Sequence, residues 1–165
     1  MPTSELVMYE EEFSKIQDIL EKLRNESNSK FVFLVDKAGQ QIASNGDIRD
    51  IDTTSLASLT AGNVAATDGL AKLIGEKEFS VLFHEGEKDN IHISIVEQRV
   101  ILVVIFDERS SLGLVRLRVK KAHGDLSDVF KVVLQKADQR AAGKGPAQSP
   151  FAEITDEDID SLFSE

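Results

Sequence analysis

The chain has 165 residues, of which 41% are hydrophobic and 29% charged, a composition typical of a globular domain with its own core. Acidic residues outnumber basic ones by 29 to 19, and the formal charge of −10 disfavours broad binding to nucleic acid or anionic membranes. The absence of cysteine excludes disulfides, thiolate catalysis, zinc fingers and cysteine-ligated iron–sulfur clusters. No apolar run approaches the roughly 20 residues that span a bilayer, and no signal peptide is recognisable, so we expect a cytoplasmic protein.

The first third of the chain predicts a helix followed by a β-hairpin. Apolar residues at helical spacing predict an amphipathic helix over 9–25, with a buried stripe of Phe13, Ile16, Leu20 and Leu23. Short apolar runs predict antiparallel strands at 30–36 and 40–45. The turn between them opens at Asp36 and closes at Gly39, where a positive φ is expected.

A second helix is predicted over 54–74, capped at its start by Asp52 or Thr53 and ended by Gly75. A core-facing stripe is expected from its larger apolar residues: Leu56, Leu59, Leu70, Leu73 and Ile74. The other side carries a small-residue ridge at steps of four, formed by Ala57, Ala61, Ala65 and Gly69, with Gly62 and Ala66 beside it. Interior glycines cost about 1 kcal/mol each relative to alanine. The ridge therefore indicates close packing, either in a dimer seam or partner platform or within the domain itself.

The rest of the domain predicts three strands and a long helix. The strands are expected at 79–83, 90–96 and 100–106, the last apolar on both faces and therefore central. An apolar seam predicts a helix over 111–138, with a bend or break at Gly124. The order α-β-β-α-β-β-β-α indicates an α+β fold with one five-stranded antiparallel sheet.

The long helix carries a basic patch on its outer face, formed by Arg116, Arg118, Lys120 and Lys121. A solvated helix face is the ordinary explanation of such a patch. A docking surface for an acidic partner is the alternative.

The chain is expected to divide into a domain over 1–138, a flexible linker over 139–150 and an acidic tail over 151–165. The tail predicts a short amphipathic helix that orders on a partner surface, since it is too short to be stable alone. Its partner anchors would be Phe151, Ile154, Ile159, Leu162 and Phe163. A solubilising tail is the alternative.

Residues that could carry chemistry are scarce. His84, His92 and His123 lack metal-ligand spacing, which favours structural or surface roles. No phosphate-binding glycine loop or catalytic serine motif is present. Arg109 lies in a predicted loop and could act as an arginine finger, although a loop anchor is favoured. We therefore predict no catalytic residue, no cofactor and no metal, and a protein that is not itself an enzyme.

Several segments resemble the Roadblock domain family, in particular its bacterial members that regulate Ras-like GTPases. The resemblance lies in residues 9–13, 31–39, 56–62, 83–86, 103–117 and 158–165, and so covers nearly the whole chain. It implies a homodimer whose middle strands pair into one continuous sheet, with the two second helices antiparallel across one face. That face, with part of the first helix, would hold one GTPase per dimer.

Carried onto this sequence, the resemblance implies a GTPase-binding surface of Ser14, Lys15, Ala61, Ala65 and Gly69. Helix packing in the dimer would involve Ala57, Gly62 and Ala66. The implied function is to accelerate GTP hydrolysis by an MglA-like small GTPase, bound in its GTP form, in cell polarity or motility. The activator would reshape the GTPase without supplying an arginine finger. A cytoplasmic location is implied, compatible with concentration at a cell pole.

Two other functions fit the same residues. A non-activating scaffold would use the same dimer to tether a GTPase. A nucleotide-exchange promoter would act through the C-terminal tail.

Overall fold

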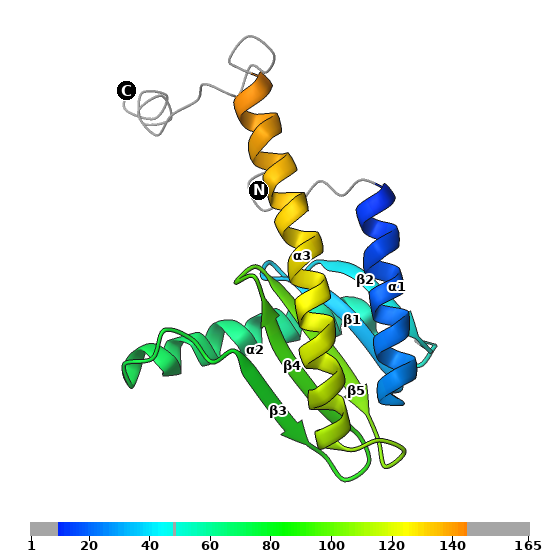
Figure 1. Ribbon diagram of the computed structural model, residues 1–165. Helices are drawn as coiled ribbons and strands as arrows, with labels where there is room; N and C mark the ends of the chain where they lie inside the picture. Colours follow the sequence, from blue (N-terminus) through cyan, green and yellow to red (C-terminus); the bar gives the residue numbers. More distant parts are fainter. Residues whose placement is uncertain (1–9, 48, 145–165) are drawn as a thin grey trace.

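A computed structural model describes residues 10–47 and 49–144 of the chain (Figure 1). The elements are α1 (Glu10–Ser27), β1 (Phe31–Asp36), β2 (Gln41–Gly46), α2 (Thr53–Leu73), β3 (Val81–Glu85), β4 (Asn90–Val96), β5 (Val100–Phe106) and α3 (Leu112–Lys144). The predicted order of helices and strands is confirmed, although β3 begins two residues later than expected. None of the helices in the described ranges combines the length and the hydrophobicity of a membrane-spanning segment.

All five strands form one antiparallel sheet in the order β2-β1-β5-β4-β3. β5 is buried along its whole length, which explains why it is apolar on both faces. The β1–β2 hairpin closes as predicted, because Gly39 adopts a φ of +91° and Asp36 Oδ1 accepts hydrogen bonds from the backbone N–H groups of Ala38 and Gln40.

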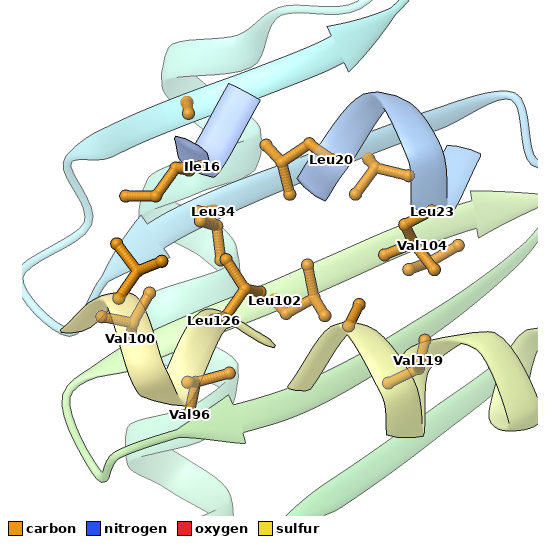
Figure 2. Close-up of a cluster of buried hydrophobic side chains, with 14 of the residues drawn as sticks. Ile16, Leu20, Leu23, Leu34, Val96, Val100, Leu102, Val104, Val119 and Leu126 are labelled. Carbon is orange, nitrogen blue, oxygen red and sulfur yellow. The ribbon is translucent and has the colours of Figure 1, made fainter. Parts of the chain in front are cut away.

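The helices form a layer on each side of the sheet (Figure 1). α1 and α3 pack side by side on one face, over a core that includes Ile16, Leu34, Leu102 and Leu126 (Figure 2). α2 lies on the opposite face, over a second core that includes Phe31 and Phe33. The sheet therefore separates two surfaces that different ligands or partners could use.

The buried stripe of α1 differs from the predicted one at its first residue. Phe13 is 40% exposed, and Glu12 is buried in its place. Glu12 lies four residues before Ile16, and its carboxylate accepts a hydrogen bond of 2.9 Å from Lys136 Nζ on α3. Burial of an acidic side chain is tolerated there because a cation from the neighbouring helix pairs with it.

α3 runs unbroken through Gly124, contrary to the expected bend or break. A Cβ at Gly124 would meet no described atom within 4 Å, so this exposed glycine neither opens the helix nor fits it to a neighbour. The helix also continues through Lys144, six residues beyond its predicted end, so the first part of the expected linker is helical. Residues 151–165, with the anchors Phe151, Ile154, Ile159, Leu162 and Phe163, lie outside the described residues.

Candidate functional site

The start and end of α2 are fixed by the residues that the sequence indicates. Asp52 is the N-cap, and its carboxylate accepts hydrogen bonds from Ser55 Oγ at 2.7 Å and Ser55 N at 3.1 Å. These bonds hold the pKa of Asp52 below its ordinary value. Gly75 follows the helix with a φ of +84° and turns the chain back toward β3.

The face of α2 that packs on the sheet is not the predicted leucine face but the one that carries the alanines. Ala57, Ala61 and Val64 pack on the sheet, where the aromatic rings of Phe31 and Phe33 already fill the space. Of the residues expected in the core, Leu56 does pack against it. The others point outward instead: Leu59, Leu70, Leu73 and Ile74 are 72%, 60%, 83% and 69% exposed. Small residues allow the helix backbone to lie close to the aromatic surface, and this close packing outweighs burial of the larger leucines.

The small-residue ridge is divided by this orientation. Ala57 and Ala61 are buried, so Ala57 packs within its own domain and Ala61 is not available for the contact that the resemblance implies. Ala65, Ala66, Gly62 and Gly69 remain exposed. A Cβ at Gly62 or Gly69 would meet no described atom within 4 Å. The packing of the described residues therefore does not require either glycine.

One continuous apolar surface results, which we call the outer face of α2. It consists of Leu59, Gly62, Ala66, Leu70 and Leu73, with Ala65 and Gly69 along one side. Asp68 and Lys72 are the only charged residues of the 21 in the helix. Sequence reasoning identified the small residues but missed the exposed leucines. The available signal was that apolar residues lie on more than one side of α2, as expected for a helix that is covered on more than one side.

α2 extends past the edge of the sheet beyond β3 (Figure 1). β3 is an edge strand, with β4 its only hydrogen-bonded neighbour in the described part of the chain. Asn63 Nδ2 lies 2.9 Å from His84 Nε2, which joins α2 to β3 where the helix leaves the sheet. The outer face of α2 and the free edge of β3 are therefore held together.

Ser14 and Lys15, the predicted contact residues of the first helix, are exposed on α1. Lys15 pairs with Glu11 at 3.4 Å along the helix surface. Because α1 and α2 lie on opposite faces of the sheet, the structure does not bring these two residues together with Ala65 and Gly69 within one chain.

Arg109 is engaged within its own loop. Its Nε donates to Asp107 Oδ1 at 3.1 Å, and its carbonyl accepts from Asn28 Nδ2 at 2.7 Å. The side-chain hydrogen bond from Arg109 is the main reason that the pKa of Asp107 lies below its ordinary value. These contacts support the loop-anchor interpretation.

The basic patch is split between two sides of α3. Arg118 pairs with Glu26 of α1 at 3.4 Å, and Lys121 lies with it beside a small pocket between the two helices. Arg116 and Lys120 instead line a second pocket between α3 and the strands β3 and β4. No cluster of histidine, aspartate and glutamate suited to a metal ion occurs in residues 10–47 and 49–144.

The comparisons with known proteins agree with this architecture. The Roadblock/LC7 domain family matches residues 15–106. The structure of MglB from Myxococcus xanthus has 62% sequence identity to this chain and a TM-score of 0.74, covering 78% of this chain and 96% of that one. Comparison with the curated proteins gave no significant match.

Two further structures are similar. The gliding protein MglB from Thermus thermophilus has 32% identity and a TM-score of 0.72, covering 75% of this chain and 94% of that one. A structure described as MglB with a tetrameric arrangement has 30% identity and a TM-score of 0.74, with 78% and 96% coverage.

Proposed function

The chain belongs to the Roadblock/LC7 domain family, and on that basis we propose that it is a homodimeric activator of GTP hydrolysis by an MglA-like small GTPase, acting in cell polarity or motility. The 62% identity to MglB over most of both chains supports this assignment more strongly than the fold alone. The protein regulates a reaction whose nucleotide is bound by its partner, so it needs no active site of its own.

The outer face of α2 is the observation that carries the proposal. Exposed leucines next to glycines form an apolar, nearly uncharged surface, which typically marks a protein interface. Gly62 and Gly69 cost the isolated helix stability without serving the packing of the described residues. A partner that approaches the helix backbone closely explains why they are present.

Dimer formation follows from the same region. Two copies that pair antiparallel along β3 extend the sheet across the contact and satisfy the backbone groups of both free edges. The part of α2 that extends past β3 then lies beside its counterpart, and Leu70 and Leu73 lose their exposure to water. Gly62 and Ala66 contribute close helix packing in this arrangement.

The GTPase binds across the paired α2 helices, where Ala65 and Gly69 leave room for its switch region. Ser14 and Lys15 of α1 remain proposed contacts, reached around the sheet edge or on the other subunit. A surface that favours the hydrolysis-competent switch arrangement binds the GTP form more tightly than the GDP form. Acceleration then comes from positioning the GTPase's own arginine and glutamine, because phosphoryl transfer depends mainly on positioning and charge stabilisation.

We propose a second contact through residues 151–165. Ile159, Leu162 and Phe163 share one side of the predicted tail helix and would insert into a groove of the GTPase. The segment after Lys144 serves as the tether. A tail contact of this kind influences nucleotide exchange or affinity rather than the hydrolytic step.

Single-turnover hydrolysis by an MglA-like GTPase preloaded with GTP, measured with and without this protein, tests the proposal. Acceleration that saturates with the concentration of this protein supports an activator. Binding without acceleration favours the scaffold, and faster release of a fluorescent GDP analogue favours the exchange promoter.

A further inference from the structure

A cavity lined by both apolar and polar side chains lies on the side of the sheet opposite α2. It has a volume of about 380 Å³ and opens between α3 and the strands β3 and β4. The cavity exists because α3 crosses the middle of the sheet and leaves the edge strand β3 uncovered on this face (Figure 1). We call it the α3–β4 pocket.

Two side chains of β4 line the pocket, each with a polar atom that has no hydrogen-bond partner in the part of the chain that the structure describes. His92 and Ser94 are 2% and 3% exposed, and both lie on the strand face turned toward α3. His92 Nδ1 and Ser94 Oγ have no hydrogen-bond partner among the described residues. Buried polar groups are nearly always paired, so two unpaired groups beside one cavity indicate a polar occupant.

The charge of the pocket is positive. Arg116 and Lys120 come from successive turns of α3, and no acidic side chain of the described residues lines the cavity. His123 Nε2 donates to the backbone carbonyl of Ile95 at 3.0 Å, which holds α3 against β4 at this point. Burial, and then the charge of Arg116, lower the pKa of His92. The imidazole is therefore neutral near pH 7, and the two helix cations supply the charge.

We propose that the α3–β4 pocket binds a small phosphate-bearing ligand, with Arg116 and Lys120 neutralising the phosphate and His92 and Ser94 hydrogen-bonding its oxygens. A phosphate carries up to two negative charges and several acceptor oxygens, which match two cations and two unpaired polar groups. The cavity is larger than phosphate alone requires, and Val81 and Val119 give the remainder an apolar lining suited to the carbon part of a phosphate monoester.

The pocket is separate from the part of the proposed GTPase surface that lies on α2. The sheet separates it from the outer face of α2, so one site does not cover the other. Pairing along β3 engages the edge of the strand and leaves its faces free. Each subunit of a dimer would carry its own pocket.

The test is a titration of the full chain with inorganic phosphate and with glycerol 3-phosphate, at constant ionic strength in chloride. The imidazole resonances of His92 report binding by NMR. We expect saturable shifts, together with a rise in the pKa of His92, because a bound anion stabilises the imidazolium form. Tighter binding of glycerol 3-phosphate identifies a monoester as the ligand, and equal binding identifies free phosphate.

Matched variants make the test specific. Arg116→Gln with Lys120→Gln should weaken phosphate binding at least tenfold, whereas Arg118→Gln with Lys121→Gln removes the same charge from α3 outside the pocket and should leave binding unchanged. Ser94→Ala removes one hydrogen-bonding group from the buried wall with little change in shape and should weaken binding without unfolding the protein.

Three results would overturn the proposal. These are shifts that do not saturate, equal losses of affinity in the two double variants, and acetate binding as tightly as phosphate. The last result would identify the pocket as a carboxylate site, suited to an acidic peptide such as the tail of this chain.

Discussion

Asn63 Nδ2 on α2 lies 2.9 Å from His84 Nε2 on β3, and this contact joins the helix that leaves the sheet to the strand at its edge. Thr67 extends the connection along α2, because its hydroxyl donates to the carbonyl oxygen of Asn63 at 2.8 Å. A second chain that pairs with the edge of β3 therefore meets the outer face of α2 in a defined position. The proposed dimer and the proposed GTPase platform depend on the same local geometry.

A lysine on the outer face of α2 should weaken the dimer. Leu70→Lys places a charge where the proposed seam is apolar, and burial of an unpaired charge is unfavourable. We expect the dimer dissociation constant to rise at least tenfold, measured by sedimentation velocity over a concentration series. Leu117→Lys is the matched control, since Leu117 is also 60% exposed on a helix but lies on α3. Equal effects of the two variants would argue against a seam on α2.

Removal of the Arg109 side chain should leave most of the activation intact. Arg109→Ala breaks the ion pair with Asp107 in an exposed loop, and no step of the proposed mechanism uses its guanidinium. An arginine finger contributes about a thousandfold or more to hydrolysis. Single-turnover rates of GTP hydrolysis at a saturating concentration of the variant test this prediction. A loss of acceleration of about a thousandfold would mean that Arg109 enters the GTPase active site.

Stability should fall as the pH drops below about 6.5, partly because of His92. The ordinary pKa of the imidazole is 6.5, and burial followed by the charge of Arg116 lowers the pKa in the folded protein. Well above pH 6.5 His92 is neutral in both the folded and the unfolded state, so it adds no pH dependence to the free energy of unfolding. Below it the unfolded chain takes up a proton that the folded chain resists, so the free energy of unfolding decreases.

The variant His92→Gln isolates this effect. Urea unfolding at pH 7.5 and pH 5.5, in a buffer free of phosphate, should show a smaller loss of stability for the variant than for the original chain. The same pH dependence in both proteins would mean that His92 does not resist protonation in the folded state.

Deletion of residues 146–165 should separate the tail from the domain. The two hydrophobic cores are built from residues between Ile16 and Val133, so we expect thermal unfolding and the dimer to be unchanged. We expect altered affinity for the GTPase or an altered rate of nucleotide release, measured by fluorescence with a labelled nucleotide. Loss of the dimer would assign the tail a structural role instead.

The sequence predicts the order of the elements because periodicity, caps and turn residues act locally. The alternation along β4, the N-cap at Asp52 and the turn at Gly39 each depend on neighbours within a few residues. The burial of Glu12 was not predictable in this way, since it depends on Lys136, 124 residues further along the chain.

The orientation of α2 at the candidate site could not be predicted from local patterns either. Either side of this helix is apolar enough to be buried, and the aromatic residues of β1 decide in favour of the alanines. The α3–β4 pocket depends likewise on where α3 crosses the sheet. Periodicity indicates that a face is apolar, but the surface opposite it determines whether that face is buried.

Single-turnover GTP hydrolysis by an MglA-like GTPase, with the original chain and with Ala65→Arg combined with Gly69→Arg, tests the central claim most directly. Two arginines beside the outer face of α2 hold a bound partner away, so we expect binding and acceleration to be lost while the dimer persists by sedimentation. A control with Asn25→Arg and Ala38→Arg adds the same charge at exposed positions elsewhere and should activate normally. Full acceleration by the Ala65→Arg, Gly69→Arg protein would contradict the assignment of α2 as the GTPase platform.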